Sequence, residues 1–171
     1  KAAGLDLAFR AVERPSAWRP DGKSFAVVDY GDVDPATVKI GVIEPALGAA
    51  AVRYTREAAR YALSGEIDGI VSAPLNKESM RAAGFHYEGA TEIFAEEAGV
   101  KRYAMVLLLG SMRLLLLTNH MSLREACDKV TKARVLEKIM LAHEALVAQG
   151  IAAPRPLLLD PFEAPIQRNP I

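Results

Sequence analysis

The stretch Ile-Asp-Gly-Ile-Val-Ser-Ala-Pro-Leu-Asn-Lys-Glu, residues 67–78, decides the fold class of this chain. Its first seven residues form a short apolar run that stops at Pro74, which predicts a buried strand. The residues that follow predict a helix over 77–83. A strand that leads through a loop into a helix is the repeating step of α/β folds.

Apolar patterns on both sides of this stretch extend the α/β prediction. Residues 25–30 predict a short buried strand, and residues 45–64 show the spacing of a long helix. Two apolar runs, 103–109 and 112–118, are separated by a Gly-Ser pair, which predicts a β-hairpin. We therefore expect an antiparallel hairpin within a mixed sheet.

Three further helices are predicted by their capping signals and apolar spacing. Thr91 is the expected N-cap of a helix over 91–98, and Ser122 with Glu125 has the spacing of a capping box. Residues 132–149 form the clearest amphipathic helix, and residues 157–159 are the one possible strand in the proline-rich end. We predict a poorly patterned segment over 1–24, one partial domain over 25–155, and a divergent tail over 156–171.

The composition narrows the classes of function. The chain has 171 residues, is 51% hydrophobic and 25% charged, and carries no net charge. These values are typical of a globular domain and give no general attraction to nucleic acid or to a membrane surface. No apolar run is long enough to span a bilayer.

The cysteine content and the first residues of the chain add two expectations. The single cysteine, Cys127, excludes an internal disulfide, fits a reducing, cytoplasmic setting, and is expected to be a buried structural thiol within a helix. The chain opens with Lys-Ala-Ala-Gly, without an initiator methionine or a signal peptide, so we expect a fragment.

Two junctions between a loop and a helix carry candidate binding residues. Asn76 and Lys77 follow the carboxyl end of a predicted strand, where ligands of open α/β sheets bind and a lysine can meet a phosphate or carboxylate. The alternative is a solvated residue in the first helical turn. At the second junction Gly89 permits close approach and the Thr91 hydroxyl can bond a ligand oxygen, or Thr91 is an ordinary cap.

The three histidines differ in what their surroundings indicate. His120 follows Thr118 and Asn119 and is expected to end an apolar strand. This position suits a metal ligand or a proton-transfer group, and a packed or surface histidine is the alternative. His143 lies on the predicted long helix and is expected at the surface. His86 stands in a Gly-Phe-His-Tyr loop whose aromatic residues indicate packing.

Standard nucleotide motifs are absent from the sequence. No G-x-G-x-x-G and no G-x-x-x-x-G-K-[ST] occurs, so a standard Rossmann or P-loop site is unsupported.

Three ordered motifs together resemble one enzyme family. They are residues 67–78, residues 83–93 (Ala-Gly-Phe-His-Tyr-Glu-Gly-Ala-Thr-Glu-Ile) and residues 118–127 (Thr-Asn-His-Met-Ser-Leu-Arg-Glu-Ala-Cys). In order and spacing they are similar to the 4-hydroxythreonine-4-phosphate dehydrogenases, especially the branch that acts on D-threonate or D-erythronate 4-phosphate. The resemblance covers about residues 25–155.

This resemblance implies a reaction and a fold. The reaction is an NAD-dependent oxidation of a 4-phosphorylated four-carbon hydroxy acid with a divalent metal (zinc, magnesium, manganese or cobalt), followed by decarboxylation. A metal that bridges the substrate hydroxyl and carboxylate would favour hydride loss and stabilise the enolate. The implied fold is a three-layer α/β/α homodimer related to isocitrate and isopropylmalate dehydrogenases, which agrees with the missing glycine motif.

The resemblance also implies roles for four residues. His120 matches the first of three metal-binding histidines, Lys77 matches the lysine of the strand–loop motif and is expected to be catalytic, and Thr91 and Asn76 are expected to bind substrate. No residue is assigned to NAD.

Departures from the family pattern favour a second hypothesis. Ala90 stands where the family has a substrate-binding histidine, and the family's glycine-rich opening motif and its Asn-Pro-His-Ala-Gly segment are not found. The alternative is therefore a truncated, catalytically inactive paralogue that acts at most as a dimerising or binding module.

Overall fold

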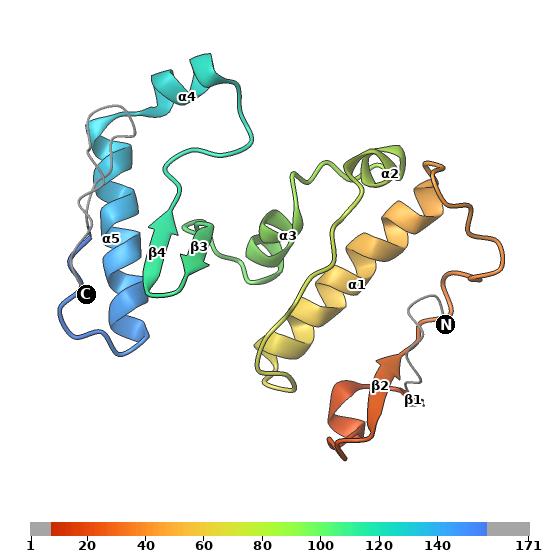
Figure 1. Ribbon diagram of the computed structural model, residues 1–171. Helices are drawn as coiled ribbons and strands as arrows, with labels where there is room; N and C mark the ends of the chain where they lie inside the picture. The colour runs from red at the N-terminus through yellow and green to blue at the C-terminus, as the bar shows by residue number, and fades with distance from the viewer. Residues whose placement is uncertain (1–7, 157–171) are drawn as a thin grey trace. The chain divides into compact units, whose positions relative to one another are not determined.

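The computed structural model describes residues 8–156, which fall into two compact units (Figure 1). The units are Lys1–Lys101 and Arg102–Ile171, so their boundary lies inside the 25–155 segment. The possible strand over 157–159 lies outside the described residues.

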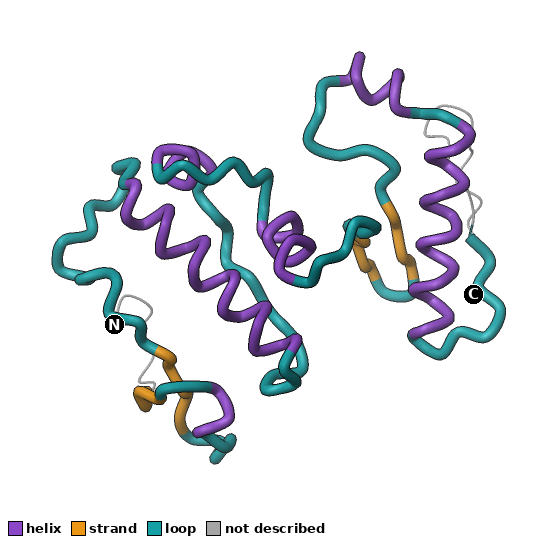
Figure 2. The backbone as a smooth tube through the Cα atoms, turned by 180° about the vertical axis from the view of Figure 1, so that it is seen from behind, coloured by secondary structure: helices purple, strands orange, loops and turns teal. Residues whose placement is uncertain are grey.

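Along the described residues of each unit, the strands come first and the α-helices follow (Figure 2). The elements are β1 (Ala8–Val12), a 3₁₀ turn (Pro15–Ala17), β2 (Ser24–Val28), α1 (Pro45–Leu63), α2 (Lys77–Ala82), α3 (Ala90–Glu97), β3 (Val106–Leu109), β4 (Met112–Leu115), α4 (Leu123–Lys129) and α5 (Lys132–Ala148). None of the helices within residues 8–156 is long and apolar enough to cross a membrane.

The core of the first unit lies where α2 and α3 pack along α1. The buried positions of α1 include Gly48, Val52, Thr55 and Ala59, which recur at helical spacing and form one face. Each of the three helices contributes one fully buried residue, and three partly buried side chains close around them. These residues are Val52, Met80 and Ile93, with Leu75, Phe85 and Tyr87 around them.

Gly48 sets how closely α1 and α2 approach. A Cβ atom at this position would lie 2.1 Å from the carbonyl oxygen of Ser79 and 2.6 Å from the backbone nitrogen of Met80. Only a residue without a side chain fits such an approach. The helix pair that carries Asn76 and Lys77 at its edge therefore depends on this glycine.

The strand predicted over residues 25–30 is present as β2, which begins one residue earlier and ends two residues earlier. The expectation that it is buried is wrong, because Phe25 and Val27 are 53% and 41% exposed. β2 pairs in parallel with β1, with Ala8 opposite Ser24, and Phe9 and Phe25 bring their rings to 6.1 Å across the two strands. The helix predicted over 45–64 is also confirmed as α1, and Gly65 follows it with a left-handed φ of +77°.

The prediction of a strand over residues 67–73 is wrong for the described structure. The segment joins α1 to α2 without joining a sheet, since the strands of residues 8–156 pair only as β1–β2 and β3–β4. The Val71 side chain is fully exposed, at 102%. A strand needs a neighbour for its backbone N–H and C=O groups, and no described strand supplies one here.

Residues 102–156 of the second unit form a hairpin and two helices. β3 and β4 pair antiparallel with Val106 opposite Leu115, and the predicted Gly-Ser turn joins them, with Gly110 at φ +56°. The hairpin prediction is thus confirmed, although both strands are shorter than the apolar runs. The long helix predicted over 132–149 is confirmed as α5.

The capping box predicted at Ser122 is also confirmed. The Ser122 side chain accepts from the Glu125 backbone nitrogen, and the Glu125 carboxylate accepts from the Ser122 backbone nitrogen. The expectation for Cys127 on the same helix is wrong, because its side chain is exposed. α4 buries none of its residues, and Ala126 is half-buried while its other positions are exposed.

The expected mixed sheet is not formed among residues 8–156. The parallel pair β1–β2 and the antiparallel pair β3–β4 belong to two separate two-stranded sheets. The three-layer arrangement and the relation to isocitrate dehydrogenases stay predictions.

Candidate functional site

Lys77 lies at the first position of α2 and takes part in an ionic cluster. Its Nζ atom is 3.0 Å from Oε2 of Glu88, and the other carboxylate oxygen is 3.4 Å from the guanidinium of Arg81. Lys77 and Arg81 are one helical turn apart on α2, so both reach the same carboxylate. This Lys77–Arg81–Glu88 cluster, half-exposed throughout, combines two cations with one anion.

Asn76, directly before Lys77, stabilises the start of α2. Its side-chain oxygen accepts from the backbone nitrogen of Ser79 at 2.9 Å, so Asn76 is the N-cap of α2. Asn76 and Ser79 also line a cavity of about 230 Å³, whose other walls come from residues 38–42 and the first turns of α1. The capping bond uses the carbonyl oxygen of the Asn76 amide, whereas an anionic substrate would accept from its NH2 group.

Thr91 is not the N-cap of α3, contrary to the prediction. Gly89 holds that position with an extended backbone, and the helix begins at Ala90. Ala90 joins the helix as its first residue because alanine has the highest helix propensity, so the N-cap falls one residue earlier, at Gly89. Thr91 is therefore half-buried in the first turn of α3, two residues from the cap.

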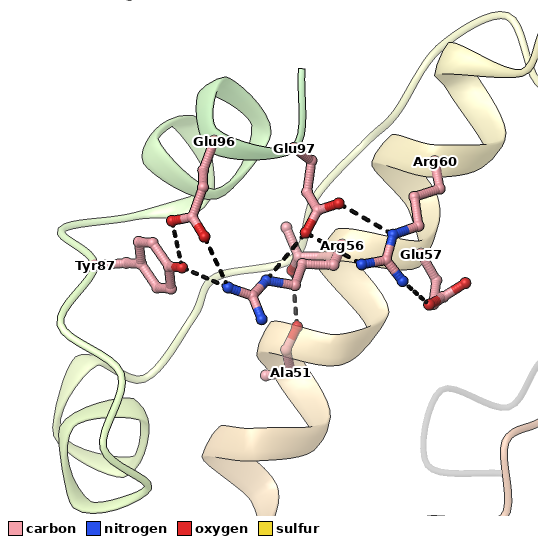
Figure 3. Close-up of polar contacts among 8 residues, drawn as sticks. Ala51, Arg56, Glu57, Arg60, Tyr87, Glu96 and Glu97 are labelled. Atoms are coloured by element: carbon pink, nitrogen blue, oxygen red, sulfur yellow. Dashed lines mark hydrogen bonds and ion pairs between the residues drawn. The ribbon is translucent and has the colours of Figure 1, made fainter. Parts of the chain in front are cut away.

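A polar network holds the loop that carries Glu88 (Figure 3). Arg56 on α1 donates to the Tyr87 hydroxyl at 2.7 Å and to the Glu96 carboxylate at 3.0 Å. The Tyr87 hydroxyl donates to Glu96 at 2.6 Å, and this bond raises the pKa of Tyr87. Since Tyr87 directly precedes Glu88, the network ties the ionic cluster to α1 and α3.

His120 belongs to the second unit and has an unusual backbone. Its φ of +54° makes it the one non-glycine residue with a positive φ among residues 8–156. The prediction that it ends a strand is wrong, because β4 stops at Leu115 and His120 lies in the loop before α4. Its side chain is exposed.

The other candidates behave as the sequence suggested. Phe85 and Tyr87 pack against the core while His86 between them is exposed, and His143 is exposed on α5. Within residues 8–156, no three His, Cys, Asp or Glu side chains are grouped so that they could hold a metal ion. A metal bound at His120 would therefore need ligands from beyond this part of the chain.

The structure joins only some of the predicted site residues. Asn76 and Lys77 are neighbours at the start of α2, and Thr91 lies in the first turn of α3 in the same unit. His120 is in the other unit. The sequence analysis missed Glu88 and Arg81. The Lys77–Arg81 spacing on a short helix was an available signal, but nothing in the sequence pairs either residue with Glu88.

Comparison with known proteins identifies the family. A sequence profile described as "Pyridoxal phosphate biosynthetic protein PdxA" matches residues 1–159. This chain belongs to the PdxA family. The match spans all four predicted site residues.

Individual proteins that are similar to this PdxA-family chain are named as dehydrogenases of 4-phosphorylated substrates. A protein of Fusobacterium nucleatum named "Putative D-threonate 4-phosphate dehydrogenase" is 33% identical over 151 residues, which are 88% of this chain and 46% of the relative. The structure of 4-hydroxythreonine-4-phosphate dehydrogenase from Klebsiella pneumoniae matches with a TM-score of 0.81 and 31% identity, over 88% of this chain and 46% of that one. A third match, the enzyme from Burkholderia phymatum, has a TM-score of 0.73 and 33% identity, over 89% and 46% of the two chains.

These findings confirm the resemblance and the α/β class. They also show that the chain spans about half the length of the relatives it matches.

Proposed function

We propose that this chain carries part of the substrate site of a dehydrogenase that oxidises and decarboxylates a 4-phosphorylated four-carbon hydroxy acid, such as 4-hydroxythreonine 4-phosphate or D-threonate 4-phosphate. The observation that carries the proposal is the Lys77–Arg81–Glu88 cluster beside the start of α3. Family membership and the names of the relatives support the substrate class.

The charges of this cluster suit an anionic substrate. Two cations face one carboxylate, which leaves a net positive charge for a phosphate or a carboxylate. Glu88 is followed directly by the N-terminal end of α3, where free backbone N–H groups and the helix dipole favour anions. Thr91 would add a hydroxyl there, and the Lys77 ammonium could exchange a proton with a substrate oxygen.

NAD, the divalent metal and the homodimer belong to the proposal as properties of the whole enzyme. His120 would supply one imidazole to the metal, and the described residues do not complete a metal site by themselves. The cytoplasmic setting is likewise part of the proposal.

Calorimetric titration of the 171-residue chain with D-threonate 4-phosphate tests the substrate site. The Lys77→Met variant should bind about tenfold to a hundredfold more weakly, because a bond from a charged donor is lost. Lys138→Met is the matched control, since this lysine lies on α5 and donates to a backbone carbonyl of its own unit. Equal affinity of the parent chain and Lys77→Met would refute the assignment.

The second candidate is the inactive paralogue that acts as a dimerising or binding module. Ala90 at the position of the family histidine favours it, because a hydrogen-bonding group is replaced by a methyl group. It predicts that the chain binds neither D-threonate 4-phosphate nor zinc. A one-to-one zinc site abolished by His120→Ala would contradict it.

A further inference from the structure

We infer that Arg134 is a positioning residue that holds the loop of His120 in its observed conformation. The inference rests on the proposed function in one respect, namely that His120 is a site residue. The loop in question, the His120 loop, comprises residues 118–121, between the end of the hairpin and α4.

The His120 loop needs an outside restraint. His120 adopts a left-handed backbone conformation that non-glycine residues rarely take, and such conformations persist only where surrounding contacts hold them. They are frequent at functional sites. Just before the loop, the Leu116 backbone nitrogen donates to the Met105 carbonyl oxygen at 3.4 Å.

Two contacts clamp the His120 loop at its ends. Upstream, Nε of Arg134 donates to the carbonyl oxygen of Leu117 at 3.1 Å in a partly buried position. Downstream, the Ser122 backbone nitrogen donates to the Glu125 carboxylate at 2.9 Å within the capping box. The downstream contact joins residues three positions apart in sequence, whereas the upstream contact joins Arg134 to a residue 17 positions earlier.

α5 provides a natural comparison for this contact. One turn after Arg134, Nζ of Lys138 donates to the carbonyl oxygen of Tyr103 at 3.0 Å. Tyr103 precedes the hairpin and Leu117 follows it, so the two cations hold opposite sides of its open end. Of these two contacts, the one from Arg134 reaches Leu117, which directly precedes the His120 loop.

Backbone ¹⁵N relaxation of the 171-residue chain tests the inference without any assay of activity. In the parent chain the order parameters of Asn119, His120 and Met121 should be near 0.85, as in rigid backbone. Arg134→Met removes every donor and should lower them below about 0.6. Arg134→Lys keeps a cationic donor on a similar stem and should leave them near the parent values, as should the control Lys138→Met.

Three results would overturn the inference: a mobile His120 loop in the parent chain, a rigid loop in Arg134→Met, or equal loosening in Arg134→Met and Arg134→Lys. A second measurement needs no variant. Exchange of the Arg134 Nε–H with solvent should be at least about tenfold slower in the folded chain than in urea, because the proton is bonded. Equal exchange rates would also overturn the inference.

Titration with Zn²⁺ alone separates this inference from the proposed function. Selective shifts of the His120 imidazole signals, with His86 and His143 unchanged, would support a metal role for His120. Uniform or absent shifts would remove that role, while the relaxation results would still decide the role of Arg134.

Discussion

Single side chains in this PdxA-family chain owe their charge state to partners far away in the sequence. Glu66, after α1, accepts from Nε of Arg14 at 3.0 Å, although the two residues are 52 positions apart. The Arg14 hydrogen bonds, with help from Ser16 and Ser64, lower the pKa of Glu66 to about 2, well below its ordinary value of 4.5. This pair ties the β1–β2 segment to the end of α1.

The Glu66 pair predicts a loss of stability in acid. A carboxylate with a lowered pKa stabilises the fold above its unfolded pKa, and this contribution disappears as the pH falls through the folded value. The free energy of unfolding of the parent chain should therefore exceed that of Glu66→Gln at pH 7, and the difference should shrink between about pH 4.5 and pH 2. Urea unfolding across this range measures it, and a constant difference would contradict the role of the charge.

At the scale of elements, close helix contacts and caps decide which segments are ordered. Gly48 brings α1 against the backbone of α2, and Asn76, Ser122 and Thr131 each cap the start of a helix. These features are local in sequence except for the glycine contact, which joins residues from two helices.

Gly48→Ala should destabilise the first unit by about 1–3 kcal/mol, because α1 and α2 must separate to admit the new methyl group. Chemical denaturation measures the change. Gly69→Ala is the matched control, because a Cβ there meets nothing within 4 Å, and it should change stability by no more than about 0.5 kcal/mol. Similar effects of both substitutions would show that the contact is not as tight as described.

Ser122→Ala should cost about 0.5–2 kcal/mol, and the loss should be confined to α4. This helix buries no residue, so its cap is a large part of what holds it. The Cα chemical shifts of residues 123–129 should move toward random-coil values. Thr131→Ala removes the cap of α5 instead and should leave these shifts unchanged.

At the scale of the whole molecule, much apolar surface of the described residues is uncovered. Leu108 and Leu109 of β3 are 70% and 78% exposed, and Val71 in the unpaired segment is fully exposed. Strands that are apolar on both faces are typical of sheets covered on both sides. Exposed edges of this kind promote association.

The 171-residue chain should therefore associate as its concentration rises. Leu108→Lys should raise the midpoint of association by about tenfold or more, because a charge would be buried in an apolar contact. Sedimentation velocity measures the midpoint. Leu123→Lys, at an 81% exposed position on α4, should leave it nearly unchanged, and an equal effect of both variants would argue against β3 as the associating surface.

The sequence by itself determined those features that depend on residues close together along the chain. The capping box at Ser122 and the Gly-Ser turn of the hairpin involve contacts within a few residues, and both were predicted. The extent of α1 was also predicted, whereas its buried face is set by contacts with α2 and α3. The three ordered motifs also identified the family before any coordinates, since they combine residue types and spacings that few proteins share.

Only the tertiary structure decided the features that depend on distant segments. It left residues 67–73 without a strand partner, exposed Cys127, paired Lys77 with Glu88, and placed Arg134 against the loop of His120. The physical reason is that pairing, burial and charge contacts depend on which remote groups are within reach, and that information is not contained in the neighbouring residues.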